Sequence, residues 1–237
     1  MMLMEVIKMT NKEFVTKLQD IATNYKTVYM LGCFGSPVTS QLIASKAKQL
    51  PMWYTSEKQA QLRKLIGKGY FAFDCVNLIK GVLWGWTGDS SKSYGGATYN
   101  SNGVPDINAD TMITKCIGVT TNFSHIEIGE AVWMSGHIGV YIGNKKVVEC
   151  TPKWSNKVQI TACLNVGSVS GLNGRKWVKH GKLPYIQYVV DKVEEPEYIK
   201  ILKEKTDSPE AWIKCIEENK DHPMLKYLPD LIVKLAK

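Results

Sequence analysis

The sequence predicts an α+β fold in which N-terminal helices pack on an antiparallel β-sheet, with a small helical region after them. Apolar residues recur at helical spacing in the first third of the chain. Short β-branched runs separated by turn residues begin near residue 128, and helical patterns return after residue 190. Helices followed by strands are typical of α+β domains. We therefore expect a main domain over residues 1–189, and a linker with a small helical region over 190–237.

Four segments of the main domain have helical patterns. They are residues 11–24, 39–49, 56–67 and 74–84. Thr10 and Glu13 match a capping box at the start of the first helix. The fourth helix starts close to Asp74, and aspartate is a strong capping residue. Between the first two helices, "YMLGCFGSPV" breaks the helical pattern with glycine and proline.

Five runs after residue 128 predict strands. They are EAVWM (130–134), HIGVYIG (137–143), KKVVECT (145–151), KVQITAC (157–163) and a last strand within 174–189. Their spacing is typical of an antiparallel meander. Residues 86–109 are rich in Gly, Ser, Asn and Tyr, which predicts a long surface loop, and such loops are often functional. The aromatic residues of 84–99 are candidates to line a sugar or peptide groove, although Trp84 equally suits the core.

Positive charge is concentrated in the main domain. The net charge is +8, with 21 Lys and Arg against 11 Asp and Glu in residues 1–189, and 9 against 11 in 190–237. A basic body favours an anionic partner such as nucleic acid, anionic lipid or a cell wall that bears teichoic acid, although net charge also serves solubility. No apolar run approaches the roughly 20 residues of a membrane helix, so no transmembrane segment is expected.

The N-terminus and the cysteines bear on the compartment. The start, MMLMEVIKMT, lacks the basic region, the long apolar region and the small-residue cleavage site of a secretory signal. We therefore expect synthesis in the cytoplasm, or export by a route that the chain does not encode. Six cysteines form no CxxC pair and no regular framework, which favours free thiols.

One cysteine lies where a thiol can be reactive. Cys75 falls in the first turn of the fourth predicted helix, where unpaired N–H groups and the helix dipole favour a thiolate. A thiolate nucleophile needs a base, and the base needs a third group that fixes its tautomer. Of the four histidines, at 125, 137, 180 and 222, His137 heads a predicted strand where its ring can be held rigidly.

Glu149 follows His137 by twelve residues, on the returning strand. If the hairpin reverses about Gly143, the two side chains share one face, provided that the loop is odd or that a two-residue turn is combined with one bulge. A strict two-residue turn would send Glu149 to the opposite face. Zinc is the chemical alternative, with ligand types at Cys75, His137, Glu149 and Cys150. Glu149 and Cys150 are adjacent, however, and point to opposite faces of a strand, which argues against one shared ion.

These residues resemble those of the NlpC-type cell-wall peptidases of the papain-like superfamily. The resemblance covers roughly residues 20–190 and rests on "FDC" at the start of an apolar helix, "GE" at 129–130 and "HIGVYIGNKKVVE". It implies a papain-like fold with Cys75 as the nucleophile and His137 as the base. It also implies that Glu149 occupies the third, orienting position, where relatives often carry His, Asn or Gln.

Further site residues follow from the same resemblance. "YMLG" is similar to the family's Tyr-x-x-Gly, which implies a role for Tyr29 in oxyanion stabilisation or substrate binding. Asp74 would help to bind the free amine of a stem peptide, together with a serine that relatives carry after the cysteine. Val76 stands at that serine's position here, which weakens the case for strict amine specificity. A helical insertion at about 36–69 would reshape the groove or bind wall polymer.

The resemblance implies a cell-wall hydrolase that cleaves an amide bond of the peptidoglycan stem peptide and needs no metal or organic cofactor. The lack of a signal peptide and the small helical tail fit a phage or prophage endolysin that is released through a membrane pore onto a Gram-positive wall. The alternative on the same fold is an N-acetylmuramoyl-L-alanine amidase. Alternatives of other classes are a non-catalytic wall-binding or phage-tail protein and a lipid-directed acyltransferase. The expected partners are peptidoglycan and anionic wall polymers, without nucleic acid.

The tail is expected to form two or three short helices. Ser208 and Pro209 match an N-cap followed by proline at the first helical position. Trp212, Ile216 and Leu231 belong to an apolar pattern that predicts a core-facing stripe. The functional alternative for this stripe is a surface for wall binding or oligomerisation.

Overall fold

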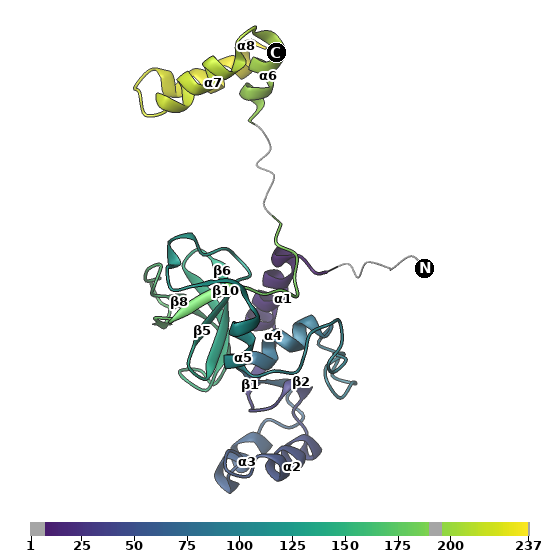
Figure 1. Ribbon diagram of the computed structural model, residues 1–237. Coiled ribbons are helices and arrows are strands. Elements are labelled where there is room, and N and C mark those ends of the chain that lie inside the picture. Colours follow the sequence, from purple (N-terminus) through teal and green to yellow (C-terminus); the bar gives the residue numbers. More distant parts are fainter. Residues whose placement is uncertain (1–7, 190–195, 237) are drawn as a thin grey trace. The chain divides into compact units, whose positions relative to one another are not determined.

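The computed structural model describes residues 8–189 and 196–236 (Figure 1). Contacts between residues divide the chain into two compact units, Met1–Val189 and Val190–Lys237. The first unit combines helices with two β-sheets, which is the α+β class that the sequence predicts. The predicted linker falls mainly on residues 190–195, which lie outside the described residues.

The first four helices begin within one residue of their predicted starts. Within residues 8–189 the helices are α1 (Asn11–Asn24), α2 (Ser40–Gln49), α3 (Ser56–Arg63), α4 (Cys75–Leu83) and α5 (Ala109–Lys115), with a 3-10 turn, η1, at Phe123–His125. Thr10 and Glu13 form the expected capping box of α1. Helix α3 ends at Arg63, so the predicted end at residue 67 is wrong, and turns follow the helix up to Gly69. Helix α5 is an addition to the predicted set, and it is too short for a periodic pattern to reveal it.

A seven-stranded sheet is the centre of the first unit. Within residues 8–189 its order is β4-β10-β5-β6-β7-β8-β9, and neighbouring strands are antiparallel except β8 and β9. The strands are β4 (Ile117–Thr120), β5 (Ala131–Met134), β6 (His137–Gly143), β7 (Lys146–Thr151), β8 (Lys157–Cys163), β9 (Gly174–Arg175) and β10 (Lys179–Lys182). The consecutive order of β5 to β8 confirms the predicted meander, whereas β4 was not expected and the last predicted strand is divided into β9 and β10.

Three short strands form a second sheet that the sequence pattern does not predict. Among the described residues they are β1 (Lys26–Tyr29), β2 (Phe34–Pro37) and β3 (Tyr70–Phe73), in the order β1-β3-β2. Strand β3 pairs in parallel with β1 and antiparallel with β2, so partners such as Val28 and Ala72 are far apart in sequence. Four-residue strands carry little periodic signal, so long-range pairing decides them. Helices α2 and α3 connect β2 to β3, and Figure 1 shows them beyond this small sheet.

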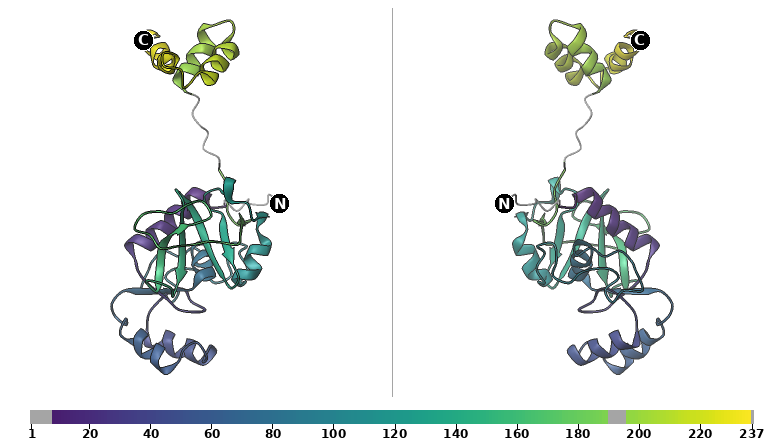
Figure 2. Two further views of the ribbon diagram at one scale, coloured as in Figure 1. Left: turned by 90° about the vertical axis from the view of Figure 1, so that its left-hand side faces the viewer. Right: turned by 90° about the vertical axis from the view of Figure 1, so that its right-hand side faces the viewer.

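The main hydrophobic core lies between the large sheet and helices α1, α4 and α5 (Figures 1 and 2). Alternate residues of β6, such as Ile138 and Val140, contribute to it. Tyr141 of β6 and Val147 of β7 belong instead to a separate cluster with Trp177. Odd-numbered residues of these two strands therefore turn away from the helices, because successive side chains of a strand point to opposite faces.

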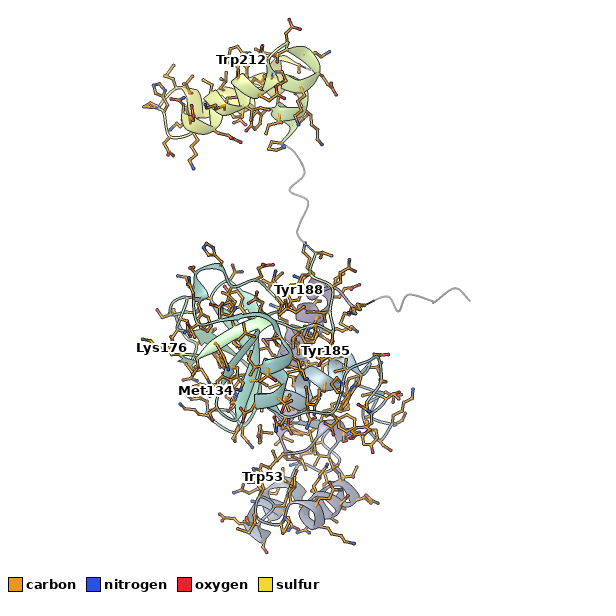
Figure 3. All side chains as sticks on the ribbon, in the orientation of Figure 1. Trp53, Met134, Lys176, Tyr185, Tyr188 and Trp212 are labelled. Carbon is orange, nitrogen blue, oxygen red and sulfur yellow. The ribbon has the colours of Figure 1, made fainter. Side chains whose placement is uncertain are left out.

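The second unit is a small helical region. Within residues 196–236 it contains α6 (Glu197–Lys205), α7 (Pro209–Glu218), a 3-10 turn, η2 (Leu225–Tyr227), and α8 (Leu228–Leu235). Pro209 opens α7 after Ser208, as predicted. Ile216 is buried, but Trp212 (Figure 3) and Leu231 are each 49% exposed. The predicted core-facing stripe is therefore wrong at these two positions, because so small a unit cannot cover all of its apolar side chains. Among the described residues, none of the helices has the length and apolar character that crossing a membrane requires.

Candidate active site

Helix α4 carries Cys75 as its first residue. Asp74 caps the helix, because its Oδ1 accepts the Asn77 N–H at 2.8 Å. Cys75 is only 7% exposed, and the backbone N–H groups of Ile138 and Val76 lie near its thiol. Helix α4 begins at Cys75, so the predicted position of the thiol at the start of a helix is confirmed. Ile138 is the second residue of strand β6, next to His137.

The end of the pairing between β6 and β7 makes room for this sulfur. In the part of the chain that the structure describes, the pairing of β6 with β7 ends, at the end away from the turn, with the pair Val140–Val148. Tyr141 donates its N–H on the side of β5, so the alternation along a strand turns the Ile138 N–H toward β7. Ile138 lies beyond the last pair, and its N–H is therefore available to Cys75.

His137 and Glu149 form a hydrogen-bonded pair. The Nε2 atom of His137, at the start of β6, lies 2.6 Å from Oε2 of Glu149 in β7. The hairpin between them combines a two-residue turn at Asn144 and Lys145, both with positive φ, with one bulge just before the turn. The bulge is the condition that the sequence required for the two side chains to share a face. Because Nε2 faces Glu149, Nδ1 is the ring nitrogen left to exchange a proton with a thiol.

Arg175 holds the same carboxylate from the other side. Glu149 is fully buried, and its Oε2 lies 2.8 Å from Arg175 Nη2. Its Oε1 accepts hydrogen bonds from Arg175 Nε at 3.2 Å and from Thr161 Oγ1 at 2.7 Å. The guanidinium lies 4.9 Å from the ring centroid of Trp154 and 5.4 Å from that of Trp177. Trp177 also stacks on the imidazole, so one cluster of side chains fixes both the Glu149 carboxylate and the His137 ring.

Sequence reasoning missed Arg175. It lies 26 positions from Glu149, in a strand of two residues with no periodic pattern around it. The signal that could have found it is compositional, because the chain has two arginines, Arg63 and Arg175, among 30 basic residues. The planar fork of arginine suits a buried carboxylate better than an ammonium does. The Nη1 atom of Arg175 also lies 3.5 Å from the sulfur of Met134. Figure 3 labels Met134 and also Lys176, the residue that follows Arg175.

His180 is placed less well than His137 to act as a base. His180 is buried, with Nδ1 against the Glu130 carboxylate and Nε2 at 2.9 Å from the Asn122 carbonyl oxygen. Both of its nitrogens face acceptors, so neither can take a proton from a thiol. His125 lies in η1, and His222 belongs to the second unit.

Burial keeps the Cys75 thiol neutral in the free protein. Loss of hydration raises the pKa of Cys75 to about 12, and the Asp74 carboxylate also raises it, whereas the backbone N–H groups lower it. The expectation that the helix start would favour a thiolate is therefore wrong, because burial outweighs the N–H groups. The proton has to pass to a base such as His137 as the thiol reacts.

Alkaline pH is expected to destabilise the fold. Burial is the main cause that raises the pKa values of Cys33, Cys75 and Cys116 from 9.0 to about 12. Above pH 9.0 the unfolded chain releases these protons and the folded chain retains them, so stability is lost as pH rises toward about 12. At about pH 10, each thiol is expected to lower the free energy of unfolding by on the order of 1 kcal/mol relative to neutral pH.

Urea unfolding at about pH 8 and about pH 10 measures this loss. The Cys116→Ala variant is expected to lose on the order of 1 kcal/mol less than the parent between the two conditions, because one thiol with a raised pKa is gone. An equal loss of stability in the variant and in the parent would show that the pKa of Cys116 is not raised in the folded protein.

Tyr29 and Asp74 belong to one loop-and-helix junction. The Gly32 N–H donates to Asp74 Oδ2 at 2.7 Å, and Asn77 Nδ2 donates to the same oxygen at 2.6 Å. Gly32 has a φ of +79°, a conformation that other residues rarely adopt. Asp74 therefore caps the helix and anchors the loop, while its role toward a substrate amine stays a prediction. Burial raises the pKa of Tyr29, so its hydroxyl stays protonated and can donate a hydrogen bond.

A cleft of about 480 Å³ opens beside the thiol. Its lining brings together Tyr29, Asp74 and Cys75, three of the residues that the sequence singled out. Gly136, the residue before His137, also lines it. The cleft can therefore admit a carbonyl group to the cysteine.

The zinc alternative is not supported by the arrangement of the side chains. Within residues 8–189 and 196–236, no three His, Cys, Asp or Glu side chains are grouped so as to hold a metal ion. Cys150 lies on the helix side of β7, with its sulfur 3.3 Å from the Phe73 carbonyl oxygen. Glu149 faces the other side, where Arg175 binds it. The opposite orientation predicted for these two neighbours is confirmed.

In the comparisons with known proteins, no protein-family model and no curated protein matches the chain. We therefore infer the function from the residues of the site and from their geometry.

Proposed function

We propose that the protein is a cell-wall hydrolase that cleaves an amide bond in the stem peptide of peptidoglycan, by a Cys–His–Glu mechanism on a papain-like fold. The observation that carries the proposal is the 2.6 Å contact between His137 Nε2 and the buried Glu149, beside a cysteine at a helix start. The resemblance to NlpC-type peptidases implies this same relation between the base and the third position. Cleavage within the stem peptide is the reaction we favour.

The proposed reaction begins with a neutral thiol. As the Cys75 sulfur attacks the amide carbonyl carbon, its proton passes to Nδ1 of His137, and Glu149 stabilises the imidazolium through Nε2. The backbone N–H of Cys75 and the Tyr29 hydroxyl donate to the oxyanion. The C–N bond then breaks, and the amine leaves with the proton from the imidazolium. Water hydrolyses the thioester, which releases a carboxylic acid and restores the thiol.

The charge of the first unit supports an anionic wall as the partner. Residues 1–189 carry 21 basic and 11 acidic residues, and segment 38–69, which contains α2 and α3, carries six basic residues and one acidic residue. A surface with this excess concentrates the protein at anionic polymers. Peptidoglycan that bears such polymers, as in a Gram-positive wall, is therefore the partner we propose.

An amidase is the second candidate, and one residue favours it. Val76, at the position where relatives carry a serine that helps to bind the stem-peptide amine, is apolar and buried. A substrate with a free amine at its N-terminus would find no hydroxyl there. This fits a substrate that lacks a free stem-peptide amine. The amidase reaction has such a substrate, because its reacting carbonyl belongs to the lactyl group of muramic acid.

Digestion of purified Gram-positive cell wall is expected to release fragments with a newly exposed amine and carboxylate. Mass spectrometry of the soluble fragments identifies the bond. A new amino end within the stem peptide indicates the endopeptidase, and a free lactyl carboxyl on muramic acid indicates the amidase. If folded protein releases no new fragments from the wall, the proposal is contradicted and a non-catalytic wall-binding protein is favoured.

A further inference from the structure

The cleft at Cys75 continues into a second hollow. This second hollow has a volume of about 550 Å³. The linings of the two hollows share four residues: Gly32, Leu50, Asn77 and Asp106. A third hollow, of about 430 Å³, continues from the second and shares with it Ser36, Leu42, Ser45 and Tyr94. We call the second and third hollows the outer channel, and each is large enough for a small-molecule-sized unit of a polymer.

Nine hydroxyl or amide side chains and two tyrosine rings contribute to the lining of the outer channel. Tyr94 and Tyr99 are 44% and 53% exposed. The hydroxyl and amide side chains come from β2, helices α2 and α4 and the loop after α4, and are Ser36, Thr39, Gln41, Ser45, Gln49, Asn77, Ser90, Ser91 and Ser93. Aromatic faces pack on the apolar faces of sugar rings, and hydroxyl and amide groups pair with sugar hydroxyls. This lining has the chemistry of a saccharide site.

Both tyrosine rings are held in place before any ligand binds. Tyr94 lies against Phe34, with the ring centroids 4.5 Å apart. Tyr99 meets Trp84 edge-on at 5.2 Å, and its hydroxyl donates to Asp106 at 2.7 Å. Rings fixed in this way lose little conformational freedom on binding, which favours affinity.

Backbone geometry favours a saccharide over a peptide, whereas the charges of the channel wall are of both signs. The Asp106 carboxylate pairs with the buried Lys80, and Lys46 adds a positive charge to the channel wall. A peptide could add to the open edge of β2, but Trp86 Nε1 donates to the Gly35 carbonyl at 2.9 Å and occupies that edge. Strand addition is therefore blocked at this position, whereas sugar hydroxyls need no open strand edge.

We infer that the outer channel binds the glycan strand of peptidoglycan, a chain of N-acetylated sugars, while the stem peptide enters the cleft at Cys75. The channel lining indicates that the ligand is a saccharide. That this saccharide is the glycan of peptidoglycan rests on the proposed function. Helix α2 forms one wall, and Trp53, labelled in Figure 3, lies 5.9 Å from the ring of Tyr29 at the cleft. A glycan held here leaves its attached stem peptide next to the cleft at Cys75.

A tryptophan introduced on α2 tests the channel. Ser45 is exposed and lines both hollows of the outer channel, so the Ser45→Trp side chain is expected to obstruct them. Ala44→Trp is the matched control, because Ala44 is exposed on the same helix and outside the channel lining. Calorimetric titration with a peptide-free oligomer of N-acetylglucosamine is expected to give at least about tenfold weaker binding for Ser45→Trp and parent-like binding for Ala44→Trp.

Two substrates separate this inference from the proposed function. The parent is expected to hydrolyse a glycan-linked stem peptide with a kcat/KM at least about tenfold above that of the same peptide without sugar, and Ser45→Trp is expected to lose this preference. Equal values on both substrates, absence of oligomer binding, or binding of the free peptide in its place would overturn the inference and leave the proposed hydrolase standing. If neither substrate is cleaved, the proposed function fails, and the oligomer titration still decides the channel.

Discussion

Cys75→Ala protein is expected to lose wall hydrolysis, with kcat lower by at least about 10⁴-fold. The substitution removes the sulfur that forms the thioester and leaves the imidazole without a proton to accept. Loss of one buried sulfur atom is expected to cost on the order of 1 kcal/mol of stability, so the fold is retained. The turbidity of a wall suspension measures hydrolysis, and circular dichroism measures the fold.

Cys116→Ala is the matched control for this experiment. Cys116 is also a free thiol whose pKa burial raises to about 12, but its sulfur lies at the end of α5, 3.5 Å from the Met112 carbonyl oxygen. This variant is expected to keep the hydrolysis rate of the parent. Equal rates for folded Cys75→Ala and the parent would show that the nucleophile is wrongly assigned.

The Arg175→Ala variant is expected to lose about 3–5 kcal/mol of stability together with its activity. Glu149 is fully buried, and removal of the guanidinium leaves its charge with Thr161 and His137 as its remaining partners. Such an uncompensated buried charge is strongly destabilising. The carboxylate is also free to change its position, and the imidazole loses its fixed orientation. Urea unfolding measures the stability, and wall turbidity measures the activity.

Two further variants show whether the fork geometry of Arg175 matters. Arg175→Lys keeps the positive charge and loses the paired contacts, so its stability is expected to lie between those of the parent and Arg175→Ala. Arg63→Ala is the control, because Arg63 is the other arginine of the chain and is exposed on α3. Its stability is expected to stay within about 0.5 kcal/mol of the parent. Parent-like stability of Arg175→Ala would disprove the proposed support of Glu149.

The relation between His137 and Glu149 could be predicted because it is local. Both residues belong to one hairpin, and the period of a strand reduces their geometry to a single condition on the turn, which the bulge before Asn144 meets. The helix start at Cys75 could be predicted for the same reason, from the capping residue Asp74. The spacing of two residues in the sequence is informative where both belong to one hairpin or to one helix start.

Features that depend on tertiary contacts could not be predicted in this way. The strands of the small sheet pair across the whole α2–α3 segment, and Arg175 reaches Glu149 from a distant two-residue strand. The pKa of Cys75 depends on how completely the fold covers the helix start, which the sequence of the helix does not reveal. The aromatic residues of the loop show the same limit. Trp84 and Trp86 are buried, whereas Tyr94 and Tyr99 line the outer channel, although all four stand within residues 84–99.

The buried, neutral thiol also affects chemical durability. Oxidants such as peroxide attack thiolates, and formation of sulfenic acid follows thiolate character and exposure. Cys75 has neither, because burial raises its pKa and leaves little of its surface in contact with solvent. The protein is therefore expected to keep its nucleophile reduced in aerated solution without added reductant. The burial that delays loss of the thiol proton also protects the sulfur until a substrate occupies the cleft.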